Sequence, residues 1–301
     1  MDTLEAMAVF IRVVERGSFS AVAREVGLSQ PTISKQIGAL EMKLGGRLFA
    51  RSTRSLCLTD EGQRYYEHCR QILAAVDNAE HSFQTGKERV AGPLRIASSG
   101  SFGRIQIAPR LHGFLKRNPE VSIDLQLSDE NVDLVSQGID VAVRIGVLKD
   151  SSLIARQIGL TKRKVFAAPS YLEHFGVPAT PGELSSHNCL IFNQLEHADS
   201  WRFQHNSTWH AVRVTGNVRS NNSESIRQMV LSGLGVSLSP SWLFREDVIA
   251  GRVVPVLEDY LPSSLPIHAV WLMDRRQSAR VRAFTEYLID AFATDDDVCI
   301  K

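Results

Sequence analysis

Apolar residues recur every three or four positions in three short segments at the start of the chain, which predicts three amphipathic helices. The segments run from Leu4 to Val14, from Phe19 to Val26 and from Ile33 to Leu44. Glycines at positions 17, 27 and 45 can end these helices, and each helix follows a good N-cap, namely Asp2, Ser18 and Ser29. The second and third helices are joined too tightly to pack antiparallel, so they must cross steeply, as in a helix-turn-helix.

A hairpin is predicted directly after the third helix. Short apolar stretches at Leu48–Ala50 and Leu56–Leu58 flank a polar turn, the pattern of two strands joined as a wing. Arg51 and Arg54 lie at its tip. We therefore expect a basic wing beside the helix-turn-helix.

The start of the third helix carries short hydrogen-bonding groups and a cation, suited to base edges and phosphates. Between Lys35 and Leu56 five cations accompany a single acid, a local charge of +4 in a chain whose formal charge is +1. The alternative, a solvated charged face, does not explain the helix order, the tight turn and the basic wing together. We predict DNA contacts from Ser29, Gln30, Pro31, Thr32, Ser34, Lys35, Arg51 and Arg54.

A long helix capped by Thr59 is predicted next, with apolar residues at alternating steps of four and three. This 3.5-residue repeat is typical of a coiled-coil seam between two subunits. The alternative is a long helix packed on its own chain. The seam positions are Tyr65, Cys69, Ile72, Val76, Ala79 and Phe83, and a glycine-flanked linker follows at 86–92.

The remaining two thirds of the chain alternate between strand and helix patterns, which indicates α/β structure around a parallel sheet. The first set has strands at Leu94–Ala97, Val121–Leu127 and Ile139–Ile145, and helices at Ile107–Leu115 and Asn131–Gln137. The second set has strands at 164–168, 189–192, 201–203, 211–214, 217–219 and 233–238, and a helix at 223–232. A strand at 267–272 and a helix at 281–292 end the pattern, and Asp295, Asp296 and Asp297 are expected to fray.

Two polar segments are candidate ligand sites, because ligands of open α/β sheets bind beyond the carboxyl ends of strands. Ser98–Gly103 follows the first strand, and Asn221–Glu224 begins a helix. Hydroxyls, an amide and free helix N–H groups suit a carboxylate. Capping and turn chemistry is the simpler reading of Ser98–Gly103. The predicted contacts are Ser98, Ser99, Gly100, Ser101, Phe102, Arg144, Gly146, Asn222 and Ser223, whereas Trp201 and Phe203 are expected in the core.

Composition narrows the class of protein. The chain has 301 residues, 44% hydrophobic and 22% charged, which is ordinary for a globular protein of two or three domains. No apolar run suits a membrane span, and the start lacks a signal-peptide layout. Four widely spaced cysteines indicate reduced thiols in a cytoplasmic protein, with Cys189 as a less favoured redox sensor. No catalytic motif, cofactor motif or metal-ligand spacing is present, so an enzyme is not expected.

The N-terminal residues resemble the winged helix-turn-helix of LysR-type transcriptional regulators. The resemblance rests on the segments 18–23 and 28–34, on Leu40-Glu41, Leu44-Gly45, Leu48-Phe49 and Leu58-Thr59, and on Ile37 and Arg51. It implies an α + α/β protein: a winged helix-turn-helix over 1–58, a linker helix and hinge over 59–90, and a type II periplasmic-binding-protein-like effector domain over 91–301. That domain would comprise subdomain I (91–161 and 267–301) and subdomain II (162–266).

The same resemblance implies a regulator of transcription that binds double-stranded DNA as a homodimer, usually paired into a homotetramer. A small-molecule effector, expected to be an organic anion, would bind between the two subdomains and alter DNA binding or bending. The alternative is a small-molecule-binding protein or enzyme built on the C-terminal module, with a vestigial N-terminal domain. The basic wing argues against that alternative.

Overall fold

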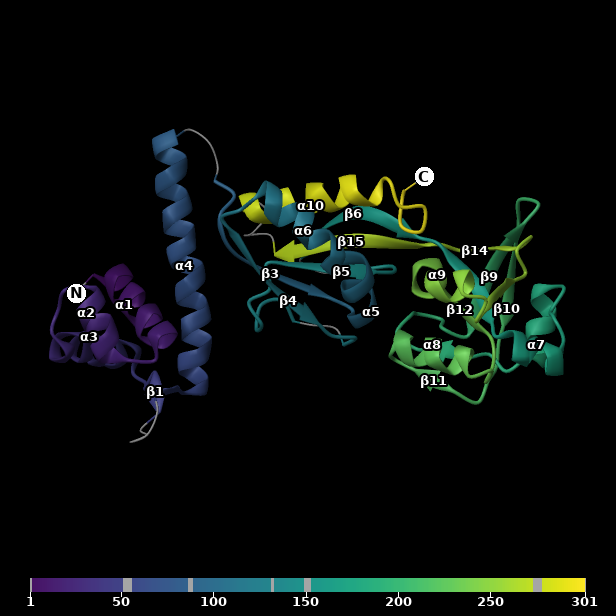
Figure 1. The fold of residues 1–301 in the computed structure, drawn as a ribbon, viewed down its shortest axis with the longest axis horizontal. Helices are drawn as coiled ribbons and strands as arrows, with labels where there is room; N and C mark the ends of the chain where they lie inside the picture. The colour runs from purple at the N-terminus through teal and green to yellow at the C-terminus, as the bar shows by residue number, and fades with distance from the viewer. Residues whose placement is uncertain are drawn as a thin grey trace. The chain divides into compact units, whose positions relative to one another are not determined.

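The computed structural model describes residues 2–50, 56–85, 89–130, 133–148, 153–272 and 278–300, and for 77–85 it describes the backbone alone. The chain forms two compact units, Met1–Pro93 and Leu94–Lys301 (Figure 1). Each unit buries hydrophobic residues of its own.

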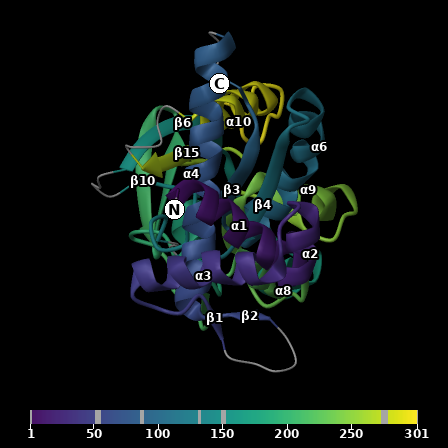
Figure 2. The ribbon, with the colours of Figure 1, turned by 90° about the vertical axis from the view of Figure 1, so that its left-hand side faces the viewer.

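The first unit contains three short helices, a hairpin and a long helix, as the sequence predicts (Figure 2). Ser18 Oγ accepts a hydrogen bond from the N–H of Ala21 at 3.2 Å, and Gly17 ends the preceding helix with φ 61°. Local capping therefore sets the helix boundaries. The elements are α1 (Thr3–Arg16), α2 (Phe19–Glu25), α3 (Gln30–Leu44), β1 (Phe49–Ala50), β2 (Cys57–Leu58) and α4 (Asp60–Thr85).

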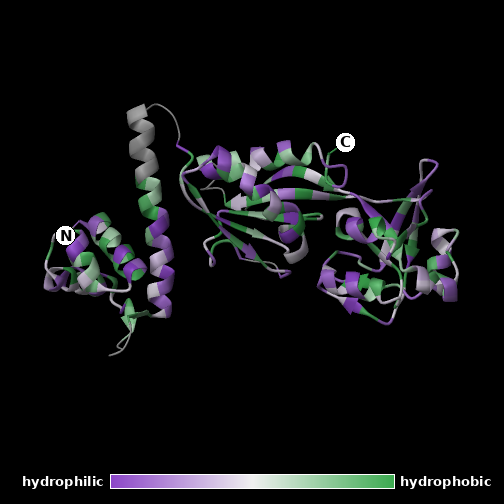
Figure 3. Ribbon diagram, viewed as in Figure 1, coloured by the Kyte–Doolittle hydropathy of each residue, from purple (hydrophilic) through white to green (hydrophobic). Residues whose placement is uncertain are grey.

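Helix α4 packs on its own chain over its first half. Cys69 is 0% exposed within the first unit's core, and the ring of Tyr65 lies 5.7 Å from that of Phe10. The prediction that Cys69 belongs to an intermolecular seam is therefore wrong, because its side chain is already covered. The next seam residue, Ile72, is 39% exposed, and Figure 3 shows α4 turning from hydrophilic to hydrophobic near this point.

The first lobe of the second unit is built on a five-stranded sheet of order β4-β3-β5-β15-β6. Strands β3 and β5 are parallel, but β15 runs antiparallel to both β5 and β6, so the sheet is mixed rather than parallel throughout. Helices α6 and α10 contact each other, with the rings of Phe114 and Phe284 5.3 Å apart. The strands are β3 (Gly92–Ser98), β4 (Val121–Leu127), β5 (Val141–Ile145), β6 (Leu153–Thr161) and β15 (Leu265–Leu272), and the helices are α5 (Gly100–Phe102), the π-helix η1 (Gly103–Ile107), α6 (Ala108–Arg117) and α10 (Ala279–Phe292).

The second lobe holds three small sheets around a core that includes Trp201 and Phe203, as predicted for both side chains. The sheet orders are β12-β7-β13, β10-β9-β14 and β11-β8. The strands are β7 (Arg163–Ala167), β8 (Ile191–Phe192), β9 (Ser200–His205), β10 (Thr208–Arg213), β11 (Arg219–Ser220), β12 (Ser237–Pro240), β13 (Val254–Val256) and β14 (Leu261–Pro262). The helices are α7 (Pro169–Phe175), the 3-10 helix η2 (Pro181–Ser186), α8 (Ser223–Leu231) and α9 (Ser241–Ile249).

Several local predictions are wrong. The described residues 133–138 form turns rather than a helix, and the polar turn 98–103 is shorter than predicted because helical structure already begins at Gly100. The sequence analysis also missed β6, α7 and α9.

The C-terminal acidic run does not fray. Asp295 accepts hydrogen bonds from Arg110 at 2.7 Å and from Arg245 at 2.5 Å, and Val298 and Cys299 are buried. The backbone N–H of Leu160 donates to Val298 O at 2.9 Å, which fastens the tail to β6. Arginines far away in sequence thus neutralise the run.

Candidate functional site

The start of α3 presents its polar residues to solvent. Ser29, Gln30, Pro31, Thr32, Ser34 and Lys35 are all exposed. Ser29 Oγ accepts from the N–H of Thr32 at 3.3 Å and lies 2.8 Å from Thr32 Oγ1, so these two hydroxyls cap the helix. Gln30, Ser34 and Lys35 make no polar side-chain contact within the described part of the chain and are available to a partner.

Buried Glu41 fixes the start of the wing, a role that the sequence analysis missed. Its carboxylate accepts from the N–H of Leu48 at 2.8 Å and of Phe49 at 3.3 Å, and pairs with Arg47 at 3.0 Å. Arg47 is thus held by a structural carboxylate, and the predicted local charge overstates what is free to meet DNA. Arg51 and Arg54, predicted at the wing tip, lie outside the described residues.

A cavity of about 610 Å³ lies between the two lobes of the second unit, a size ordinary for small-molecule sites. Of the predicted ligand contacts, Ser98, Ser99, Arg144 and Ser223 line it. Gly100, Ser101, Phe102, Gly146 and Asn222 do not. Phe102 is instead a core residue, fully buried against the rings of Trp242 and Phe292 at 5.3 and 6.0 Å.

The two predicted polar segments do come together, but they bond to each other through the protein's own groups. The N–H of Gly100 donates to Asp129 Oδ1 at 2.9 Å, and Asn222 Nδ2 donates to Asp129 Oδ2 at 2.5 Å. Ser223 Oγ donates to Ser101 Oγ at 2.9 Å. The predicted position of a ligand carboxylate is therefore taken by the side chain of Asp129, a residue that sequence reasoning did not select.

Two guanidinium groups and one hydroxyl are the polar features of the cavity that stand apart from these bonds. Arg163 donates to Ser263 O and Oγ, both at 2.7 Å, and burial lowers the pKa of its guanidinium to about 10. Burial also lowers the pKa of Arg144. Ser98 Oγ lines the same cavity, is in a residue 5% exposed, and has no hydrogen-bond partner among the described residues.

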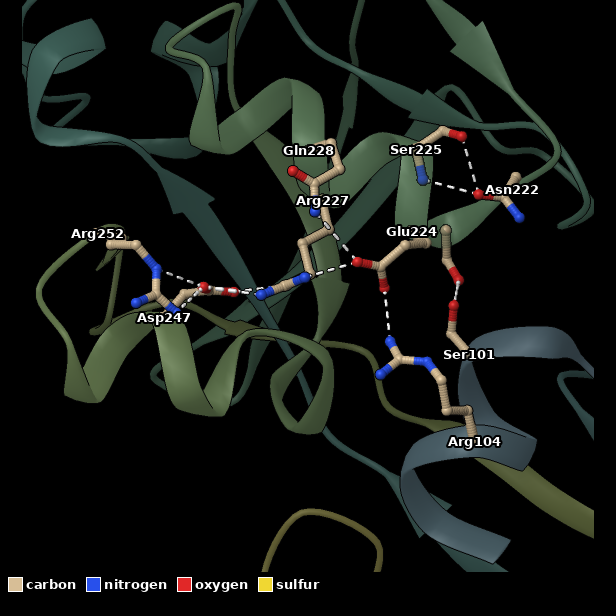
Figure 4. A network of polar contacts seen from close by, with 10 residues as sticks. Ser101, Arg104, Asn222, Glu224, Ser225, Arg227, Gln228, Asp247 and Arg252 are labelled. Atoms are coloured by element: carbon tan, nitrogen blue, oxygen red, sulfur yellow. Dashed lines mark hydrogen bonds and ion pairs between the residues drawn. The ribbon is translucent and has the colours of Figure 1, made fainter. Parts of the chain in front are cut away.

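An ion-pair network crosses between the lobes beside the cavity (Figure 4). Arg104 of the first lobe pairs with Glu224 of α8 at 2.9 Å, and Glu224 pairs with Arg227 at 2.6 Å. Arg227 also pairs with Asp247 of α9 at 2.6 Å. Burial alone would raise the pKa of Asp247, but hydrogen bonds from Arg227 and Arg252 more than offset it and lower the pKa.

Redox and metal chemistry find little support in the described residues. Cys189 is buried, its Sγ donates to Leu184 O at 3.4 Å, and burial raises its thiol pKa to about 12, so the reactive thiolate is scarce. Among the described residues no group of three His, Cys, Asp or Glu side chains could hold a metal ion. No helix among those residues is long and apolar enough to span a membrane.

Comparison with known proteins assigns both units. Residues 4–63 match the model of the bacterial regulatory helix-turn-helix protein of the lysR family, and residues 87–293 match the LysR substrate binding domain. The chain belongs to the LysR family. It is a LysR-type transcriptional regulator, and the predicted fold class and function are confirmed.

Relatives extend the match over nearly the whole chain. The transcriptional regulator DmlR of Escherichia coli (strain K12) is 34% identical over 97% of this chain and 95% of its own length. The solved structure of CrgA, a LysR-type regulator from Neisseria meningitidis, has a TM-score of 0.60 and 30% identity over 95% of this chain and 98% of its own. The full-length Vibrio cholerae virulence activator AphB has a TM-score of 0.57 and 28% identity over 96% and 99%. These matches give no support to a vestigial N-terminal domain.

Within this LysR regulator, the sequence analysis missed the cavity residues that come from distant segments. Asp129, Arg163 and Trp242 line the cavity but follow no recognisable motif. One signal was available for Asp129, since it closely follows the strand Val121–Leu127, at whose carboxyl end a ligand contact was to be expected.

Proposed function

We propose that this LysR-type regulator docks on duplex DNA through the start of α3, with Gln30, Ser34 and Lys35 meeting bases or adjacent phosphates. Their exposure and their lack of polar contacts within the described residues support this assignment. Ser29 and Thr32 order the helix start, and Pro31 favours its first turn. Arg51 and Arg54 stay predicted wing contacts to the DNA backbone or minor groove.

The effector is a small organic anion with an apolar body, bound in the cavity between the lobes. The single observation that carries this part is the cavity itself, with two buried guanidinium groups, an unpartnered hydroxyl and apolar walls. Its apolar lining includes Val143, Leu153, Ile226, Leu238 and Trp242. Both lobes line the cavity, so a ligand there can favour one arrangement of the lobes and thereby change how DNA is bound.

The regulator acts as a dimer joined by α4 beyond the part that packs on its own core. The exposed Ile72 begins a hydrophobic stretch that continues to Val76. Two subunits present two copies of α3, which predicts an inverted-repeat DNA site and multiplies the phosphate contacts. Pairing of two such dimers follows from the family rather than from any contact in this chain.

The test compares Lys35→Ala with Lys43→Ala in an electrophoretic shift assay on random duplex. Both variants remove one cation from α3, but Lys43 Nζ donates to Thr3 Oγ1 at 2.6 Å, away from the proposed contacts. We expect Lys35→Ala to weaken binding roughly tenfold, since it removes a charged phosphate or base contact in each subunit. We expect Lys43→Ala to bind nearly as the wild type does. Equal affinities for both variants would refute the proposed docking.

A further inference from the structure

The Asp129 carboxylate occupies a small anion site made by groups from both lobes. On one side the backbone N–H of Gly100 donates to Asp129 Oδ1 at 2.9 Å. On the other side Asn222 Nδ2, from the second lobe, donates to Asp129 Oδ2 at 2.5 Å. Both carboxylate oxygens are therefore engaged, and the bond to Asn222 joins the lobes.

The orientation of the Asn222 amide is fixed independently of Asp129. Asn222 Oδ1 accepts from the N–H of Ser225 at 2.8 Å and from Ser225 Oγ at 2.9 Å, because Asn222 caps α8 (Figure 4). Its Nδ2 must then point away from the helix, toward Asp129. A second lobe-to-lobe bond, from Ser223 Oγ to Ser101 Oγ, lies next to it. A backbone N–H and a fixed amide donor are the groups that would bind a carboxylate from solution.

The cavity wall offers a different place for the polar group of a ligand. Ser98 Oγ lines the cavity in a residue 5% exposed and lacks a hydrogen-bond partner among the described residues. Buried polar groups are normally satisfied, so this hydroxyl points to a missing partner. Arg144 follows β5, whose Val143 is paired with Ser98 in the sheet, so the hydroxyl and this guanidinium lie at the same edge.

We propose that Asp129 is a specificity-determining residue, an internal carboxylate that fills the Gly100–Asn222 anion site and holds the two lobes together in the free protein. It denies that site to an effector carboxylate, which is thereby directed to Ser98 and Arg144. This inference rests on the proposed effector site. It predicts that removing the Asp129 carboxylate creates a vacant site of the size of formate, open to small carboxylates from solution.

The experiment is chemical rescue of full-length Asp129→Ala, followed by its thermal midpoint in sodium formate and in sodium chloride of equal ionic strength. Loss of the charged hydrogen bonds lowers the Tm by about 3–10 °C, and formate restores at least half of that loss. Glu130→Ala is the matched control, because it removes the neighbouring carboxylate that also lines the cavity. Formate leaves the Tm of the wild type and of Glu130→Ala where chloride leaves it.

A swap of the two side chains tests the same contact without a cavity, should Asp129→Ala fail to fold. Asn222→Asp keeps a good helix cap but places two carboxylates together, and Asp129→Asn places two amides together. Each single variant has a lowered Tm, whereas the double variant Asp129→Asn with Asn222→Asp regains most of it, since donor and acceptor face each other again.

Two results overturn the inference: formate that stabilises all proteins alike, and a double variant whose loss equals the sum of the single losses. Neither measurement needs DNA or an effector. A failed rescue alongside a normal DNA shift therefore refutes the role of Asp129 alone, and a rescue alongside absent DNA binding refutes the proposed docking alone.

Discussion

Replacement of Asp247 by asparagine removes a buried charge from the network that holds α8 to α9. The Asp247 side chain is 0% exposed, and its two oxygens accept from Arg227 Nε at 2.6 Å, Arg227 Nη2 at 2.9 Å and Arg252 Nε at 2.9 Å. The Arg227 side chain is only 17% exposed, so Asp247→Asn leaves a largely buried guanidinium without its main counter-charge.

The magnitude follows from that burial. Breaking a buried ion pair on one side costs about 3–5 kcal/mol, and we expect the low end, ~3 kcal/mol, because asparagine keeps the shape and one acceptor oxygen. The pair with Arg252 adds little, since that side chain is 51% exposed and screened by water. For a unit of this size the loss corresponds to a Tm lower by about 6–12 °C.

The pH dependence of this loss has a definite sign. The pKa of Asp247 is lower in the folded protein than in the unfolded chain, so its stabilisation is complete above about pH 4 and is lost as pH falls through the lowered value. The free energy of unfolding of Asp247→Asn should therefore fall less steeply below pH 4 than that of the wild type.

Urea unfolding at pH 7 and at pH 3 measures both effects. Glu286→Gln is the control, because its ion pair with Arg156 is long, 4.0 Å, and about half exposed on both sides. It should change the free energy by under about 0.5 kcal/mol. An Asp247→Asn protein as stable as this control at pH 7 would refute the reasoning about the network.

Two other predictions concern the thiols and the dimer. Native Cys189 should resist alkylation at pH 8 while exposed Cys57 reacts, since burial raises the Cys189 pKa to about 12; mass spectrometry of tryptic peptides checks this, and early labelling of Cys189 would contradict it. Ile72→Asp should weaken dimerisation in sedimentation equilibrium while Tm changes little, because this side chain is 39% exposed in the single subunit; an unchanged dimer constant would exclude α4 beyond Cys69 as the interface.

Local signals in the sequence predicted the first unit well. Asp2, Ser18 and Ser29 each cap the helix assigned to them, because capping depends on residues two or three positions apart. The extent of the coiled-coil seam was beyond such signals. The same apolar side chain serves a partner helix or the chain's own core, and only the packing against Phe10 shows that Cys69 and Tyr65 belong to the latter.

Distant charge pairing accounts for most of what the sequence did not predict in the second unit. Asp295 looks solvated in sequence, but Arg110 and Arg245, at least 50 positions away, order it. Asp129 likewise meets Asn222 across 93 positions. The helix starts at Gly100 and Ser223 were located correctly as polar segments, yet their partner proved to be an internal carboxylate, which no pattern of hydrophobic and polar residues reveals.

Salt dependence of binding to a random duplex tests the nucleic-acid surface of this regulator. Fluorescence anisotropy at 50 and 200 mM salt should show affinity falling steeply, with the logarithmic slope reduced by about 1 for each Lys35 contact removed by Lys35→Ala. Binding that is absent at 50 mM salt, or that has no salt dependence, would contradict a cationic surface at α3 and the wing.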